Sequence, residues 1–196
     1  MYLAAVGRVG DSLTELGRAR ELDAGSPIVN TNFGWSLLYA RRSPQAVDQF
    51  RQTVQLDPNY VSARWGLGVA YAQESLYSEA IAELKQAVAL SDGSPALLGH
   101  LGYAYGRSGA TAAATKTIAE LRKLAERQYV PSSAVALVYA GMENKAMTLE
   151  WLERAYQEHD FSLVFIQVAP WFESVRGEPR FQKLLRDMQL ATRSAQ

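Results

Sequence analysis

The sequence has no cysteine, no net charge and only two histidines among its 196 residues. The lack of cysteine excludes disulfide frameworks, thiolate metal sites and cysteine nucleophiles. It also suits a reducing compartment, and the first residues lack a basic leader, so we expect a cytoplasmic location. Lys+Arg and Asp+Glu are equal at 20 each, so the basic excess of a typical nucleic-acid binder is missing. No apolar run approaches the ~20 residues of a membrane span. We therefore expect neither nucleic acid nor membrane as a partner.

Groups that could converge for catalysis or metal binding are also scarce. His100 and His159 are too far apart to form a pair on one helix, and neither belongs to a metal-ligand pattern. The carboxylates of Glu150 and Glu153 are most simply solvated. The run Gly66-Leu67-Gly68 lacks the preceding strand and third glycine of a phosphate loop. We expect no catalytic residue, no metal and no cofactor, and therefore no enzyme.

What the sequence does have is an internal repeat of 34 residues that needs no insertion or deletion between residues 12 and 155. Internal repeats of this length are typical of helical solenoids. One column of the repeat holds small residues and another, three positions later, holds mainly tyrosine. A further column holds a small residue in the second half of each unit. These columns are Gly34, Gly68, Gly102 and Ala136; Leu37, Tyr71, Tyr105 and Tyr139; and Ser12, Ala46, Ala80, Ala114 and Thr148.

The spacing within each unit predicts two helices. Ala80, Leu84 and Ala87 are spaced i, i+4, i+7, which places them on one helical face. Proline and turn residues separate the units, as in Leu56-Asp57-Pro58-Asn59. The small residues Gly68 and Ala80 would allow the two backbones of a unit to approach closely. A glycine inside a helix costs roughly 0.5–1 kcal/mol relative to alanine, and close packing would compensate for that cost.

This pattern resembles the tetratricopeptide repeat family, most closely in Leu67-Gly68-Val69-Ala70-Tyr71 and in Tyr77–Ala87. The resemblance implies an all-α, right-handed solenoid of stacked antiparallel helix pairs. We expect about four and a half repeats over residues 1–160, followed by a C-terminal capping segment over 161–196. The units are 1–26 (partial), 27–60, 61–94, 95–128 and 129–162. Within the cap, a final amphipathic helix is expected at Glu178–Met188.

In this family the first helix of each unit lines a concave groove that binds partners. The residues expected to face the groove are Thr31, Trp35, Tyr39, Trp65, Val69, Gln73, His100, Tyr103 and Arg107. Tryptophan, tyrosine and arginine are enriched in binding hot spots. Gly99 and Gly106 are expected to leave pockets between the rings. The Lys/Asn clamp by which some family members hold a C-terminal carboxylate is absent. We therefore expect a protein or peptide ligand with an apolar or aromatic segment.

Three hypotheses of function remain at this stage. The first is a groove-based protein-interaction module, part of a larger bacterial regulatory or assembly protein. The second is a homo-oligomerisation scaffold, for example a homodimer. The third is a small-molecule sensor or enzyme that uses His100, Tyr103 and Arg107. A structural alternative applies to the groove itself, because Trp35 and Trp65 could pack against the next helix rather than face a ligand.

Overall fold

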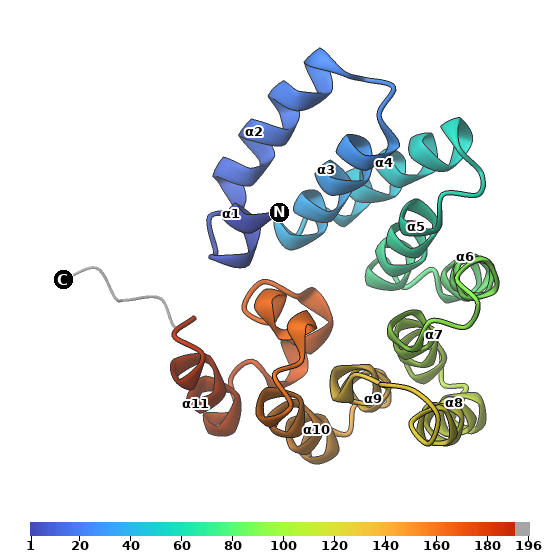
Figure 1. Cartoon of the computed structure of the whole chain (residues 1–196), viewed down its shortest axis with the longest axis vertical. Coiled ribbons are helices and arrows are strands. Elements are labelled where there is room, and N and C mark those ends of the chain that lie inside the picture. The colour runs from blue at the N-terminus through green and yellow to red at the C-terminus, as the bar shows by residue number, and fades with distance from the viewer. Residues whose placement is uncertain (191–196) are drawn as a thin grey trace.

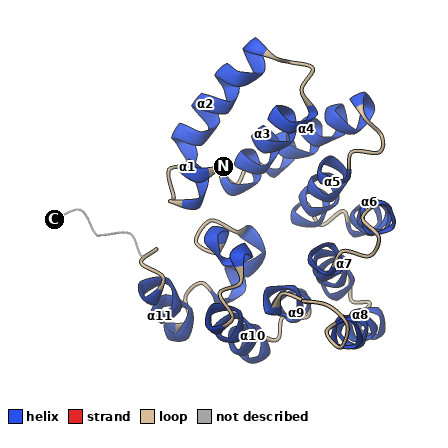
Figure 2. Cartoon of the chain, in the orientation of Figure 1, coloured by secondary structure: helices blue, strands red, loops and turns tan. Residues whose placement is uncertain are grey.

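The computed structural model describes residues 1–190, which contain helices and no strands (Figure 2). The α-helices and two short 3₁₀ helices (η1 and η2) follow one another along the chain as α1 (Tyr2–Ala5), α2 (Val9–Leu22), α3 (Pro27–Tyr39), α4 (Ser43–Leu56), α5 (Val61–Gln73), α6 (Tyr77–Leu90), α7 (Pro95–Arg107), α8 (Thr111–Leu124), α9 (Ser132–Gly141), α10 (Lys145–Gln157), η1 (Phe161–Phe165), η2 (Pro170–Val175) and α11 (Pro179–Asp187).

Successive helices pack as pairs, and each pair packs on the next. Helix α3 packs on α4, α5 on α6, α7 on α8 and α9 on α10, while α4 contacts α5 and α6 contacts α7. The short α1 and the longer α2 form an incomplete first pair. The prediction of an all-α solenoid of two-helix repeats is therefore confirmed.

The repeat is visible in the backbone as well as in the side chains. The first helix of each pair ends at a residue with positive φ, and these residues are 34 positions apart: Gly7, Arg41, Ser75, Gly109 and Glu143. At each one, the next residue donates its N–H to a carbonyl five positions back, as in Arg42 N to Leu37 O at 2.9 Å and Leu76 N to Tyr71 O at 2.9 Å. This hydrogen bond is the signature of a Schellman C-cap.

The column of small residues allows close approach, as the sequence predicts. A Cβ added to Gly68 would lie 3.1 Å from the carbonyl oxygen of Ala80 and 2.6 Å from Cγ of Leu84. Phe50 is a larger member of the column that holds Leu84. Its ring is fully buried between Gly34 and Gly66, where a Cβ on either glycine would overlap it.

The helix pairs curve until the two ends of the described chain approach each other (Figure 1). Helix α11 packs on α10, where Phe181, Leu184 and Leu185 are buried. Residues 161–176, which we call the inner segment, do not extend the stack. They lie inside the curve of the helices, where η2 contacts α9 and α10, and η1 contacts α1. Residues 191–196 of the predicted cap lie outside the described residues.

Candidate functional site

Four predicted groove residues meet on the inner face of the solenoid. Trp35 and Tyr39 come from α3, Trp65 from α5 and His100 from α7, each the first helix of its pair. The ring centroids of Trp35 and Trp65 are 4.7 Å apart, and those of Trp65 and His100 are 5.4 Å apart. Neighbouring repeats thus place one aromatic side chain beside the next along the inner face.

The inner segment covers these rings with aromatic side chains of its own. Trp171 lies edge-on against His100, with ring centroids 5.0 Å apart, and 6.3 Å from Trp35. Phe165 stacks on Tyr39 with centroids 5.4 Å apart and planes inclined by 9°. We call these six side chains, Trp35, Tyr39, Trp65, His100, Phe165 and Trp171, the aromatic cluster. The inner face is therefore occupied by the chain itself.

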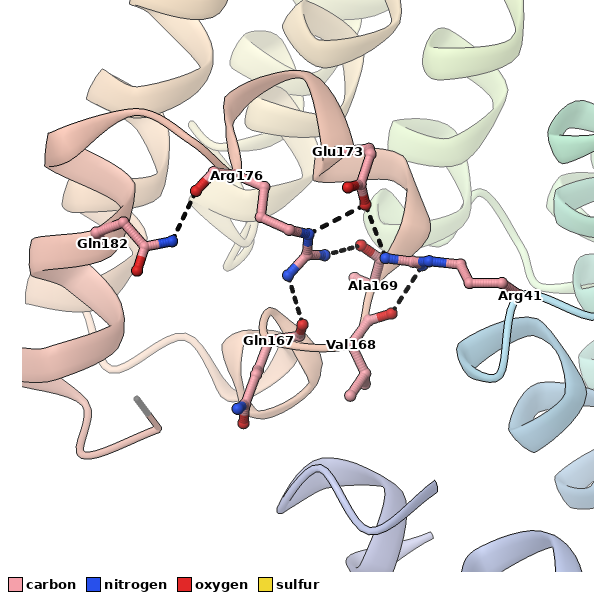
Figure 3. Close-up of polar contacts among 7 residues, drawn as sticks. All are labelled: Arg41, Gln167, Val168, Ala169, Glu173, Arg176 and Gln182. Atoms are coloured by element: carbon pink, nitrogen blue, oxygen red, sulfur yellow. Dashed lines mark hydrogen bonds and ion pairs between the residues drawn. The ribbon is translucent and has the colours of Figure 1, made fainter. Parts of the chain in front are cut away.

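Arg41, in the turn between α3 and α4, ties the inner segment to the repeats (Figure 3). Its Nη1 donates to the backbone oxygen of Val168 at 3.0 Å, and its Nη2 forms an ion pair with Glu173 at 2.8 Å. The residue that carries this side chain is also one of the positive-φ residues that end the first helices. The left-handed turn therefore presents the guanidinium to a segment more than 100 positions away in the sequence.

A second guanidinium holds the inner segment in shape. Arg176 donates to the backbone oxygens of Gln167 at 2.6 Å and Ala169 at 2.9 Å, and its Nε lies 3.0 Å from the Glu173 carboxylate (Figure 3). Gln182 of α11 in turn donates to the backbone oxygen of Arg176 at 2.7 Å. These bonds satisfy carbonyl groups that the short 3₁₀ helices leave unpaired.

Burial sets the protonation states within the cluster. It lowers the pKa of His100 to about 3, so the imidazole is neutral at physiological pH. Burial also raises the pKa of the Tyr39 phenol. The indole Nε1 of Trp65 is buried and has no hydrogen-bond partner within residues 1–190.

A cavity of about 350 Å³ lies between the repeats and the inner segment. One wall comes from the repeats, including Trp35, Trp65, His100 and Leu137, and the other from Leu163, Phe165, Ile166, Ala169, Trp171 and Phe172. Its volume is within the range of pockets that bind small molecules. Tyr129 and Phe161 also line it and are 64% and 79% exposed, so the cavity reaches the surface beside them.

Asp160 supplies the carboxylate of this cavity, and its oxygens are already used. It accepts hydrogen bonds from the backbone N–H of Ser133 at 3.0 Å and of Ser162 at 3.0 Å, and from the Ser162 hydroxyl at 2.8 Å. The carboxylate caps η1 and connects it to the start of α9. It therefore acts as a structural link between the inner segment and the repeats.

Comparison with known proteins supports the interpretation of the repeats. Residues 31–95, from α3 to the start of α7, match the family model described as tetratricopeptide repeat. The chain therefore contains tetratricopeptide repeats within residues 31–95. No curated protein matches the chain.

Several solved structures, two of them described as tetratricopeptide repeat proteins, share the fold at low sequence identity. TTC0263 of Thermus thermophilus is 20% identical over 87% of this chain and 93% of its own, with a TM-score of 0.64. YrrB, described as having an unusual peptide-binding site, is 17% identical over 91% of this chain and 93% of its own, with a TM-score of 0.52. A chain of the APC/C hetero-tetramer Cut9–Hcn1 is 16% identical over 96% of this chain but only 35% of its own length, with a TM-score of 0.64.

The remaining predicted groove residues lie on the same helices of these tetratricopeptide repeats but outside the aromatic cluster. Thr31 and Val69 are buried. Gln73, Tyr103 and Arg107 lie together in a second group, where burial raises the pKa of Tyr103 while Gln73 and Arg107 act in the opposite direction. Arg107 also forms an ion pair with Glu143. His100 belongs to the aromatic cluster, whereas Tyr103 and Arg107 of the same helix belong to this second group.

The expectation that Gly99 and Gly106 leave pockets is wrong. A Cβ on Gly99 would lie 2.8 Å from the backbone of Ala134, and one on Gly106 would lie 2.5 Å from the backbone of Gly141. Both glycines are therefore used for close packing of α7 on α9. The cavity arises instead where the inner segment spans the repeats.

The sequence does not predict that Trp171 and Phe165 lie against the first helices of the repeats. The inner segment lies outside the repeat and has no periodic pattern, so its position in the fold could not be predicted from the sequence. A usable signal was its composition, since Phe161–Phe172 is strongly apolar although it lies between two amphipathic helices.

Residues 1–190 contain neither a metal-binding group nor a membrane-spanning helix. No group of three or more His, Asp or Glu side chains there could hold a metal ion. None of the helices in this part of the chain is both long enough and apolar enough to cross a membrane.

Proposed function

We propose that this tetratricopeptide repeat protein is a protein-interaction scaffold whose inner aromatic face binds an apolar protein segment containing aromatic residues. Tetratricopeptide repeat proteins bind protein or peptide partners, and this fold presents a series of first helices on one concave side.

One observation carries the proposal, namely that the inner segment is itself a segment of this kind. Phe165 and Trp171 use the same contacts a partner would use, stacking on Tyr39 and lying against His100 and Trp35. Aromatic pairs of this type contribute ~0.5–1.5 kcal/mol each beyond the area they bury. The structural similarity to YrrB, a repeat protein described as having a peptide-binding site, is consistent with the proposal.

A partner would have to compete with the inner segment. A tethered segment has a high effective concentration, on the order of millimolar for short flexible connections. The affinity of an external segment is reduced by the fraction of molecules in which the inner face is free. Weakening the inner segment should therefore increase binding of an external segment without any change on the inner face.

The test uses the sequence of residues 160–176 as a fluorescently labelled peptide. The receptor is the full chain carrying Phe165→Ala and Trp171→Ala, which removes the two aromatic anchors and leaves Trp35, Tyr39, Trp65 and His100 in place. Fluorescence polarisation should show saturable binding at least ~10-fold tighter than to the wild-type chain. Circular dichroism and a thermal unfolding curve establish that the double variant keeps its helices.

Two controls make the result specific. A peptide with alanine in place of its phenylalanine at 165 and its tryptophan at 171 should not bind. Adding Trp35→Ala to the receptor should weaken binding of the native peptide. If the folded double variant binds the native peptide no better than the wild type does, the inner face does not recognise aromatic segments and the proposal fails.

A further inference from the structure

The cavity between the repeats and the inner segment has features of a small-molecule site. Ligand binding in this cavity would be a function additional to the proposed one and does not depend on it. Its walls are mostly apolar and aromatic side chains. Pockets for small molecules usually combine such walls with a few polar groups that orient the ligand. The polar groups that face this cavity therefore indicate the class of ligand.

Most of the polar groups of the cavity are already paired with one another. Asp160 accepts three hydrogen bonds from Ser133 and Ser162. The Ser162 hydroxyl lies 2.6 Å from that of Ser133. These groups form a closed network at one end of the cavity, so they have little capacity left for a ligand.

His100 differs from that network. Burial accounts for its low pKa, with no charged or hydrogen-bonding neighbour contributing. Its ring lies among Trp65 and Trp171, with centroids 5.4 Å and 5.0 Å away. A neutral imidazole carries one N–H donor and one acceptor nitrogen. A ligand hydroxyl that reaches one of these nitrogens can form a hydrogen bond with it in surroundings that are otherwise apolar.

The charge of the ligand follows from the same surroundings. Within residues 1–190 no Lys or Arg side chain lines the cavity, so an anion would find no counter-ion there. The Asp160 carboxylate is occupied by its own hydrogen bonds, so a cation would be only weakly compensated. Transfer of an unpaired charge into such a site is costly. The planar rings on both walls favour a flat aromatic molecule.

We infer that the cavity between the inner segment and the repeats binds an uncharged, planar aromatic molecule whose single hydroxyl group pairs with His100. Tyr129 and Phe161 mark the side from which the molecule enters. Because the inner segment forms one wall, a bound molecule would favour the state in which that segment covers the repeats.

The experiment compares two probes of similar shape, 2-naphthol and 2-methylnaphthalene, which differ in the hydroxyl group. Binding to the full chain is measured by equilibrium dialysis at pH 7, where 2-naphthol is uncharged. The protein is either wild type or His100→Phe, which keeps an aromatic ring in the cluster and removes its polar atoms. The affinity for 2-naphthol divided by the affinity for 2-methylnaphthalene should be about fivefold higher in the wild type than in His100→Phe. A factor of about five is expected for one hydrogen bond.

His159→Asn is the matched control, since His159 is the other histidine and does not line this cavity. It should leave the affinity ratio unchanged. A second readout does not depend on the folding of any variant: adding 2-naphthol to the ¹⁵N-labelled wild type should shift the ring-nitrogen resonances of His100 and not those of His159. The inference is overturned if neither probe binds saturably. It is also overturned if both bind with the same ratio in wild type and His100→Phe, or if the His100 resonances do not move.

Discussion

Single residues with positive φ end the first helices of the pairs. This conformation favours glycine, yet other residues occupy the position in some repeats, where their side chains make long-range contacts. Glycine occupies this position in two repeats, at Gly7 and Gly109. Arg41 and Glu143 occupy it in two others, where their side chains form ion pairs with Glu173 and Arg107. The left-handed conformation costs an L-residue about 1 kcal/mol. In these two repeats, long-range ion pairs accompany that cost.

Within residues 1–190 the side chain of Ser75 is hydrogen-bonded only to the nearby Tyr77, so replacing Ser75 with glycine should stabilise the protein. Its side chain is exposed and its φ is 60°. We expect Ser75→Gly to raise the free energy of unfolding by ~0.5–1 kcal/mol in urea denaturation. Ser108→Gly is the control, because Ser108 has right-handed dihedral angles one position before the equivalent turn. There the glycine should destabilise the protein, and equal effects of both substitutions would contradict this explanation.

His100 should make stability depend on pH. Its pKa is about 3 in the folded protein because of burial, whereas an unfolded histidine has a pKa of about 6.5. Below pH 6.5 the unfolded chain therefore binds a proton that the folded chain does not, and stability falls as the pH falls. Between pH 7.5 and pH 5.0 the wild type should lose about 2 kcal/mol more than His100→Phe does. Parallel urea curves for the two proteins would contradict a buried neutral His100.

At the scale of elements, the contact between neighbouring helix pairs depends on which residue fills the space between their first helices. Phe50 of α4 occupies the place taken by Leu16, Leu84, Ile118 and Leu152 in the other repeats. Its ring lies against Gly34 of α3 and Gly66 of α5, which is why glycine is found at both positions. Close packing against the Phe50 ring thus explains both Gly34 and Gly66.

The dependence of Gly66 on Phe50 can be measured by a double-mutant cycle. Gly66→Ala should lower the free energy of unfolding by ~1–3 kcal/mol in the wild type, because its Cβ would overlap the Phe50 ring. In a Phe50→Leu background the same substitution should be neutral or stabilising, since alanine is the better helix former by ~1 kcal/mol. Additive effects of the two substitutions would show that the ring is not the cause.

The repeats and the inner segment differ in how far the sequence reveals them. Ala80, Leu84 and Gly68 recur every 34 residues, so helix periodicity and column identity together predicted the pairs and their close contact. The same pattern placed Trp35, Trp65 and His100 on first helices. What covers them was not predictable, because the inner segment occurs once and its contacts join residues far apart in the chain. Short 3₁₀ helices also lack the periodicity by which a buried face is recognised.

At the scale of the whole molecule, the inner segment connects the two ends of the curved array. Arg41 reaches it from the second helix pair, and η1 contacts α1. The solenoid is thereby constrained by contacts that neighbouring repeats alone do not supply. Repeat proteins otherwise depend mainly on nearest-neighbour interfaces.

Removing the Arg41 side chain should therefore loosen the inner segment more than the repeats. We expect Arg41→Ala to increase hydrogen exchange of backbone amides within residues 161–176 by about tenfold, with little change in α5–α8. Arg42→Ala serves as the control, since Arg42 is adjacent and exposed and its side chain makes no hydrogen bond to the inner segment within residues 1–190. Equal effects of the two substitutions would show that the Arg41 contacts do not hold the segment.

The inner segment, from the C-terminal region of the same chain, occupies the inner aromatic face. Nuclear Overhauser measurements on the wild-type protein test this arrangement most directly, because only four tryptophans and two histidines need to be distinguished. Protons of the Trp171 ring should give cross-peaks to those of His100 and Trp35, whose ring centroids lie 5.0 Å and 6.3 Å away. A Trp171 ring with random-coil shifts and no cross-peak to either residue would contradict the account.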